Sequence, residues 1–274
     1  MPHVDERTDQ VAGVEVLTRE ARSRGVTAPV VYLHGVPSSS SDWLPFLERI
    51  GGHAPDLPGF GRSGKPAHFD YSIAGYGAFL RAYVDALGLD RFSLVMHDWG
   101  AVGFALAMAV PERVERIVAL DVVPFLPGYR WHRVARLWRT PLLGEMTMGF
   151  TFKRSMRQGS REWLYAPGPA PDAMVDEVWR HFDHGTQRAI LKLYRSAPPA
   201  TLAAAGERLG SVKAPALVVW GAEDTYLPTS FAHALGDALG GPAKVEVVDE
   251  ARHWPWLDKP ELVDRVAGFL RGSA

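Results

Sequence analysis

The segment SLVMHDWGAVGFALA, residues 93–107, decides the fold. It begins as an apolar strand, turns at Asp98, and continues with the spacing of an apolar helix. Asp98 occupies the place of the serine in the nucleophile motif G-x-S-x-G, whose small flanking residues permit a strained turn. Gly100 is present, but Met96 replaces the first glycine. The segment predicts a carboxylate nucleophile, with an ordinary helix N-cap aspartate as the alternative.

Short β-branched runs on both sides of this segment alternate with helical patterns, such as residues 74–87 and 100–110. Continuous apolar strands separated by helices are typical of a parallel sheet covered on both faces. The sequence therefore predicts an α/β fold with a mostly parallel central sheet flanked by helices. The strand runs are VVYLHG (30–35), FSLVMHD (92–98), RIVALDVV (116–123), ALVVWG (216–221) and KVEVVD (244–249).

The alternation is interrupted from residue 125 to 199, where tryptophan, arginine and proline are dense and no strand run is present. We expect a helical cap here, inserted between two parts of the core, residues 1–124 and 200–274. Ligands of open α/β sheets bind beyond the carboxyl ends of the strands, so this insertion should cover the site. A covered site is a pocket from which water is largely excluded.

Composition limits the possible partners. Thirty basic and 31 acidic residues give a net charge of -1, which provides no global field for nucleic acid or an anionic membrane. The absence of cysteine excludes disulfides, thiolate metal sites and a cysteine nucleophile. The first ten residues do not resemble a secretory signal, so we expect a cytoplasmic protein. The longest apolar stretch, residues 92–110, contains His97 and Asp98 and indicates a buried strand and helix, not a membrane span.

Two later strand ends carry the other residue types of a catalytic triad. WGAEDTYLP (220–228) presents Asp224, and EARHWPWLDKP (250–260) presents His253, 29 residues further on. Either residue alone would more often be a surface group. The order nucleophile, acid, histidine is the one expected when all three follow strands of such a sheet.

Backbone donors are expected beside Asp98. HGVP (34–37) closes an earlier strand, so the N–H group of Val36 can point at the same place as that of Trp99. Two such donors form an oxyanion hole, and removing one typically costs about 3 to 4 kcal/mol.

The remaining motifs predict neither a cofactor nor a metal site. DLPGFGRSGKP (56–66) lacks the pattern G-x-x-x-x-G-K-[ST] and is interpreted as a structural loop. His181, Asp183 and His184 have metal-like spacing without a further ligand group, so a polar helix face explains them better. His97 is expected to be structural.

The chain resembles the epoxide hydrolase and haloalkane dehalogenase branch of the α/β-hydrolase superfamily in HGVPSSSSDW, DLPGFGRSGKP, HDWG, GAEDTYLP and RHWPWLDKPE. HDWG is the specific element, because serine hydrolases of this fold have a serine there. The resemblance implies an α/β-hydrolase fold and two-step covalent catalysis. Asp98 attacks an sp3 carbon, and water activated by His253 hydrolyses the alkyl-enzyme ester. The implied substrate is a small, largely apolar epoxide or haloalkane.

The leaving group distinguishes the two reactions. An epoxide oxygen must be protonated, and AILKLYRSAPP (189–199) resembles the segment in which epoxide hydrolases carry a cap tyrosine. Tyr194 would then be the proton donor, with simple packing as the alternative. A second cap tyrosine is usual, but residues 131–150 contain none, which leaves Tyr129 and Tyr165 as candidates.

A halide leaves without a proton and needs only N–H donors, for which Trp131 and Trp138 are candidates. Many dehalogenases carry an asparagine where this chain has Val36, which counts against that reaction. Some dehalogenases place the acid after the strand that precedes the cap, so Asp121 is the alternative to Asp224. We favour epoxide hydrolysis, with haloalkane dehalogenation as the alternative.

His34 and Pro37 are further candidates for substrate contact. A non-catalytic relative that binds a small apolar ligand is the alternative from another class, and the complete triad argues against it. An esterase is weaker still, because a carboxylate that attacks an acyl carbon yields an anhydride. The sequence leaves the exact substrate and the oligomeric state open.

Overall fold

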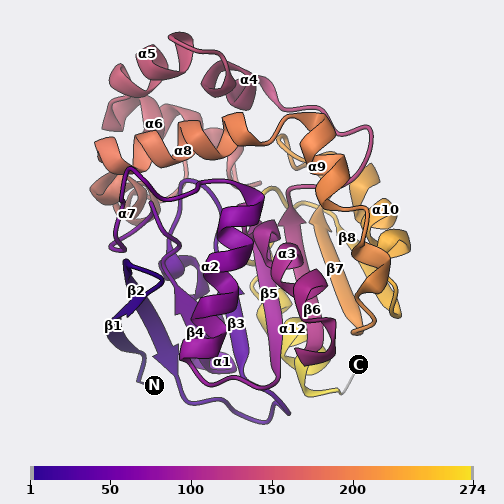
Figure 1. Cartoon of the computed structure of the whole chain (residues 1–274). Helices are drawn as coiled ribbons and strands as arrows, with labels where there is room; N and C mark the ends of the chain where they lie inside the picture. The colour runs from indigo at the N-terminus through magenta and orange to yellow at the C-terminus, as the bar shows by residue number, and fades with distance from the viewer. Residues whose placement is uncertain (1–2, 273–274) are drawn as a thin grey trace.

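The computed structural model describes residues 3–272, and its centre is one eight-stranded sheet of order β1-β2-β4-β3-β5-β6-β7-β8 (Figure 1). All neighbouring strands from β4 to β8 are parallel, and β2 joins β4 antiparallel. The predicted mostly parallel sheet is confirmed. The five expected strands are β3 (Val30–Leu33), β5 (Phe92–Asp98), β6 (Val114–Val122), β7 (Ala216–Gly221) and β8 (Ala243–Val248).

Three strands lack the continuous apolar runs of the others. β1 (Asp5–Val11) and β2 (Val14–Ala21) form an antiparallel hairpin at the edge of the sheet, and β1 is almost entirely exposed. Its sequence DERTDQV is accordingly polar. β4 (Gly52–Pro55) has only four residues. β1 was not predicted because its edge position leaves it polar, and β4 because it is short. β2 lies inside the sheet, but its sequence VEVLTREA has charged residues that interrupt the apolar run.

Helices cover both faces of the sheet. In Figure 1, α2 (Ile73–Ala86) and α3 (Gly103–Ala109) lie in front of it, and α1 (Leu44–Arg49) and α12 (Glu261–Arg271) lie behind it. With helices on both faces, β3, β5 and β7 are buried along their whole length. The expected helix at 100–110 begins later than predicted, because residues 99–102 form a 3₁₀ turn.

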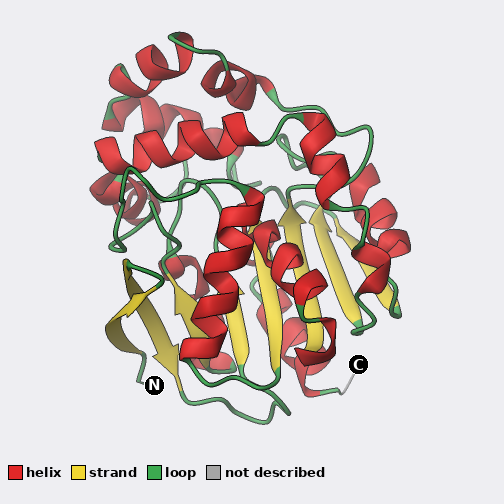
Figure 2. Cartoon of the chain, in the orientation of Figure 1, coloured by secondary structure: helices red, strands yellow, loops and turns green. Residues whose placement is uncertain are grey.

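Residues 133–196 form a helical insertion beyond the carboxyl ends of the strands, shown in red above the yellow sheet in Figure 2. The predicted boundaries at residues 125 and 199 stay a prediction. The helices are α4 (Arg133–Arg139), α5 (Leu143–Gly149), α6 (Lys153–Gly159), α7 (Asp172–His181) and α8 (His184–Ser196), and α9 (Pro199–Ala205) and α10 (Ser230–Ala238) follow in the core. Within residues 3–272, no helix is long and apolar enough to cross a membrane.

Candidate active site

The turn after β5 is strained at Asp98, which adopts φ 47° and ψ -118°. A non-glycine residue in this conformation costs about 1 to 3 kcal/mol and persists only where its surroundings enforce it. Gly100 is required here, because a Cβ atom on it would lie 2.1 Å from the carbonyl oxygen of Leu33. The Met96 side chain needs space at Gly103, where a Cβ atom would lie 2.7 Å from the Met96 sulfur. Gly103 thus makes room for the methionine in place of the motif's first glycine.

Backbone N–H groups surround the Asp98 carboxylate. Val36 N donates to Asp98 Oδ2 at 2.8 Å. Burial raises the pKa of Asp98, and this effect is opposed by His253 and by the N–H groups of Val36 and Trp99. A Cβ atom on Gly35 would lie 2.4 Å from Asp98 Cβ, so glycine is what allows the 34–37 loop to approach this closely.

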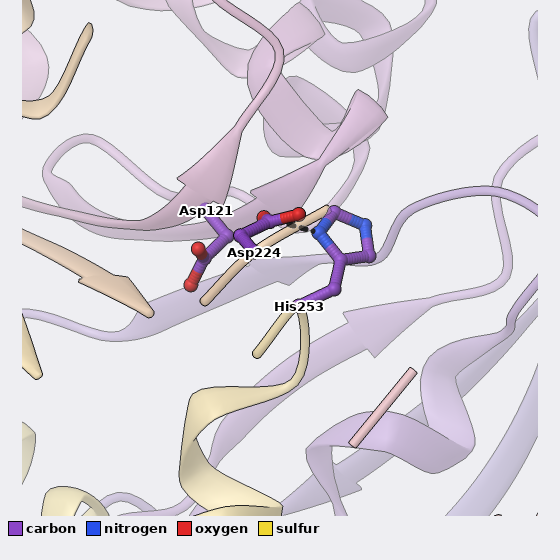
Figure 3. A group of neighbouring side chains, drawn as sticks. All are labelled: Asp121, Asp224 and His253. Carbon is purple, nitrogen blue, oxygen red and sulfur yellow. Dashed lines mark hydrogen bonds and ion pairs between the residues drawn. The ribbon is translucent and has the colours of Figure 1, made fainter. Parts of the chain in front are cut away.

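His253 lies between two carboxylates. Its Nδ1 is 2.8 Å from Asp224 Oδ2, the dashed contact in Figure 3, and its Nε2 is 3.9 Å from Asp98 Oδ1. Burial lowers the pKa of His253, but the charges of Asp224 and Asp98 outweigh burial and raise it above its usual value. His97 Nε2 donates to the carbonyl oxygen of His253 at 2.7 Å, so His97 holds the histidine loop in place.

Asp121 lies beside Asp224 (Figure 3), and oxygens of both carboxyl groups and a nitrogen of His253 lie within 4.8 Å of one another. One Asp121 oxygen accepts from Gly221 N at 2.9 Å, and the other has no hydrogen-bond partner among the described residues. Burial, followed by the charge of Asp224, raises the pKa of Asp121 well above its usual value. Among the described residues, this is the one group of three possible metal ligands whose ligand atoms lie this close together. Asp224 and His253 already use two of these atoms for the 2.8 Å contact with each other.

A cavity of about 290 Å³ lies above Asp98 and His253, and the helical insertion supplies most of its walls. The walls are mainly apolar and aromatic, which suits a largely apolar ligand. The predicted residues Val36, Pro37, Trp138 and Tyr194 line this cavity. Further lining residues are His132, Arg133, Thr151, Ser155, Met156, Glu162, Trp163, Phe182, Tyr226 and Trp254.

Two predicted contact residues are engaged elsewhere. His34 is fully buried, its Nδ1 donates to Gly35 O at 2.8 Å and its Nε2 accepts from Leu57 N at 2.9 Å, so neither nitrogen is free for a substrate. Trp131 donates its indole N–H to Ala197 O at 2.9 Å and is not a cavity residue. A tryptophan whose N–H is occupied in this way cannot serve as a halide donor.

The two candidate second tyrosines also lie outside the cavity. Tyr129 is buried against Trp131 and Phe231, and its hydroxyl has no partner among the described residues. Tyr165 is 41% exposed and lines a different hollow. The residues with metal-like spacing are His181, Asp183 and His184. The Asp183 carboxylate caps α8 and pairs with Lys65 at 2.6 Å.

His132 was not predicted as a functional residue, although it lies in the segment searched for a second tyrosine. It precedes α4, where Ala135 N donates to its Nδ1 at 3.4 Å. Burial, followed by the charge of His253, lowers the pKa of His132 to about 4, so the ring is neutral at pH 7. With Nδ1 as an acceptor, the single ring proton is on Nε2, and His132 is a donor in the cavity wall.

The sheet order, the left-handed turn at Asp98 and the histidine at the carboxyl edge define a hydrolase of the α/β class. The family model described as "Alpha/beta hydrolase family" matches residues 30–266, and the chain belongs to this family.

Similar sequences and similar solved structures carry different names. The chain is 30% identical over 212 residues to a haloalkane dehalogenase of Mesorhizobium japonicum, which is 68% of this chain and 63% of that protein. It thus spans less than two thirds of that relative's length. Haloalkane dehalogenase DbeA from Bradyrhizobium elkani USDA94 superposes with a TM-score of 0.83 at 25% identity, covering 99% of each chain. Epoxide hydrolase CorEH gives 0.84 at 20% identity, covering 98% of this chain and 99% of that one, and supports the fold alone.

Proposed function

We propose that this hydrolase opens epoxides to vicinal diols through a covalent ester on Asp98. The observation that carries the proposal is the pair of neutral donors, Tyr194 and His132, in the wall of the cavity that contains Asp98. Burial, followed by the charge of Asp98, raises the pKa of Tyr194 well above its usual value, so its hydroxyl keeps its proton at pH 7. An epoxide oxygen needs such donors, because it leaves as an alkoxide.

In the first step, Asp98 Oδ1 attacks an epoxide carbon, while Oδ2 stays bound to the N–H of Val36. The carbon–oxygen bond of the ring breaks, and the oxygen takes the proton of Tyr194, with His132 Nε2–H as a second donor. The product is a hydroxyalkyl ester of the enzyme.

In the second step, a water molecule between His253 Nε2 and the ester gives a proton to the imidazole and attacks the ester carbonyl carbon. The oxyanion forms at the N–H groups of Val36 and Trp99. Asp224 stabilises the resulting imidazolium through its 2.8 Å contact with Nδ1. When the intermediate collapses, the ester oxygen takes the proton held by His253 and leaves as the second hydroxyl of the diol, and Asp98 is left as a carboxylic acid. The remaining proton of the water then passes from Asp98 to the Tyr194 phenolate, which regenerates the Asp98 carboxylate and the neutral tyrosine.

Haloalkane dehalogenation is the second candidate, because the indole N–H of Trp99 is buried and the described residues offer it no acceptor other than the Tyr194 hydroxyl. A halide beside the Asp98 carboxylate would accept from such a group. The halide also needs a second donor, and only Trp138 of the two predicted tryptophans lines the cavity. Nothing in that reaction uses the hydroxyl of Tyr194.

Turnover of styrene oxide and of 1-bromobutane by the Tyr194→Phe variant tests the choice. The proposal predicts hydrolysis of styrene oxide, reduced about 10²- to 10⁴-fold in the variant, because a general acid contributes that much. Tyr165→Phe, outside the cavity, is the matched control and should retain full activity. Bromide release that is insensitive to Tyr194→Phe, without epoxide turnover, would favour the dehalogenase. Turnover of neither compound would favour a binding protein.

A further inference from the structure

The outer end of the helical insertion exposes an apolar surface. Leu143 and Met146 on α5 and Phe150 at its C-cap follow one another at helical spacing, and this side of the helix faces solvent while Met148 is buried. A surface helix normally turns such a stripe toward the core. Within the described chain, six of the ten exposed large hydrophobic residues lie in a span of 16 residues. We call these six the 137–152 patch: Leu137 (41% exposed), Leu142 (77%), Leu143 (48%), Met146 (55%), Phe150 (69%) and Phe152 (61%).

The chain's small net charge hides a strong local excess of positive charge around this patch. Residues 130–161 include eight arginine and lysine residues and one acidic residue, Glu145, whereas the rest of the chain has 22 basic and 30 acidic residues. Lys153 and Arg157 pair with acids of α7. Arg136 precedes the patch in the sequence and Arg154 follows it, and both side chains are exposed. Neither arginine takes part in an ion pair within residues 3–272.

The patch also adjoins the wall of the active-site cavity. Thr151 lies between Phe150 and Phe152 and lines the cavity, as do Ser155 and Gly159 on the next helix. Figure 1 shows α4 and α5 at the end of the molecule farthest from the two termini. A flat partner on this end would lie beside the wall of the cavity that the insertion supplies.

We propose that the 137–152 patch docks this protein on an anionic lipid surface. Leucine, methionine and phenylalanine suit the boundary between headgroups and acyl chains, and flanking arginines suit anionic headgroups. A second copy of the chain fits less well, because a two-fold interface places the same patch on both partners and brings the arginines of one copy against those of the other. Docking does not depend on the proposed function. Transfer of a bilayer-dissolved epoxide into the cavity rests on it.

Co-sedimentation of the full chain with vesicles tests the proposal. We expect binding to phosphatidylcholine vesicles containing phosphatidylglycerol, little binding to pure phosphatidylcholine, and loss of binding at high salt. Phe150→Ser/Phe152→Ser should weaken binding by roughly tenfold or more for each side chain, from the apolar burial that is lost. Arg136→Gln and Arg154→Gln should each cost about fivefold. Val247→Ser, which removes an exposed apolar residue of β8, is the matched control and should bind normally.

Turnover of a water-soluble epoxide should be unchanged in all these variants, since none of the residues lines the cavity, and this confirms that they fold. Absence of binding to anionic vesicles by the wild-type chain would overturn the proposal. A dimer in sedimentation velocity that dissociates in Phe150→Ser/Phe152→Ser, without vesicle binding, would assign the patch to self-association and overturn it as well. Inactivity toward epoxides with normal vesicle binding would overturn the proposed function alone.

Discussion

Replacing Asp224 with asparagine tests which carboxyl group orients His253. Asp224 Oδ1 accepts from the N–H groups of Tyr226 at 2.7 Å and Leu227 at 3.1 Å, so the asparagine carbonyl should keep that place and its NH₂ group should face His253. Because the NH₂ group is a donor, Nδ1 of His253 must accept a hydrogen bond from it, and the single ring proton is then on Nε2. Nε2 is the atom that has to take the proton of the water, so in this tautomer it is blocked. In a serine protease, the wrong histidine tautomer costs about 10⁴ in rate, and we expect a similar loss in ester hydrolysis.

The neighbouring acid, Asp121, determines how much ester hydrolysis we expect the Asp224→Asn variant to retain. Removing the charge of Asp224 makes ionisation of Asp121 easier, so part of its role can pass to the neighbouring carboxylate. We expect Asp121→Asn alone to change hydrolysis by less than about threefold, because the hydrogen bond to His253 comes from Asp224 and a raised pKa favours the neutral form of Asp121, which an amide resembles. The double variant should be at least about tenfold slower than Asp224→Asn, as expected for coupled neighbours.

Rapid-quench mass spectrometry of the alkyl-enzyme measures these rates, since ester formation does not need His253 and should continue in every variant. The ester should therefore accumulate in Asp224→Asn. If Asp121→Asn costs as much as Asp224→Asn, or if the double variant is no slower than Asp224→Asn, the assignment of the two acids is wrong.

The same geometry predicts the titration of His253, the pH dependence of ester hydrolysis and the effect of a substitution at Gly35. Asp224 raises the pKa of His253, so NMR titration of the imidazole should show protonation at lower pH in Asp224→Asn than in the wild type, and an unchanged titration would contradict the ion pair. Ester hydrolysis in the wild type should rise with pH through that pKa, because only the neutral ring accepts a proton. Gly35→Ala should reduce turnover by about 10² or more, because the new Cβ atom would displace the Asp98 carboxylate. Gly149→Ala, with nothing within 4 Å of its Cβ, is the control, and full turnover in Gly35→Ala would refute the argument.

The parallel part of the sheet was predictable because both of its faces are covered, which makes strands such as β5 and β7 continuously apolar. The positions of Asp98, Asp224 and His253 followed from the same signal, since each comes at or after the end of a strand and parallel strands end at one edge. The choice between Asp224 and Asp121 did not follow. Asp121 lies near the end of β6 and Asp224 follows the neighbouring strand β7, and the 2.8 Å contact with His253 distinguishes them.

The cavity wall was less predictable, because neighbouring residues of the insertion point in different directions. Trp131 binds Ala197 O through its indole N–H, whereas His132, the next residue, lines the cavity. The contact between Trp131 and Ala197 joins residues 66 positions apart, and no local pattern encodes it. In the proposed mechanism, His132 takes the place of the expected second tyrosine as a neutral donor, and only its capping contact and its burial point to this role.

The most direct test of the covalent route is a single turnover of styrene oxide by excess enzyme in ¹⁸O-water. If Asp98 attacks the epoxide, the oxygen added in the first turnover comes from its carboxylate, because water attacks the ester carbonyl and not the substrate carbon. The diol should then be largely unlabelled, and ¹⁸O should appear in the peptide that contains Asp98. Fully labelled diol with no ¹⁸O in that peptide would show that water attacks the epoxide directly, and Asp98 would be at most a general base.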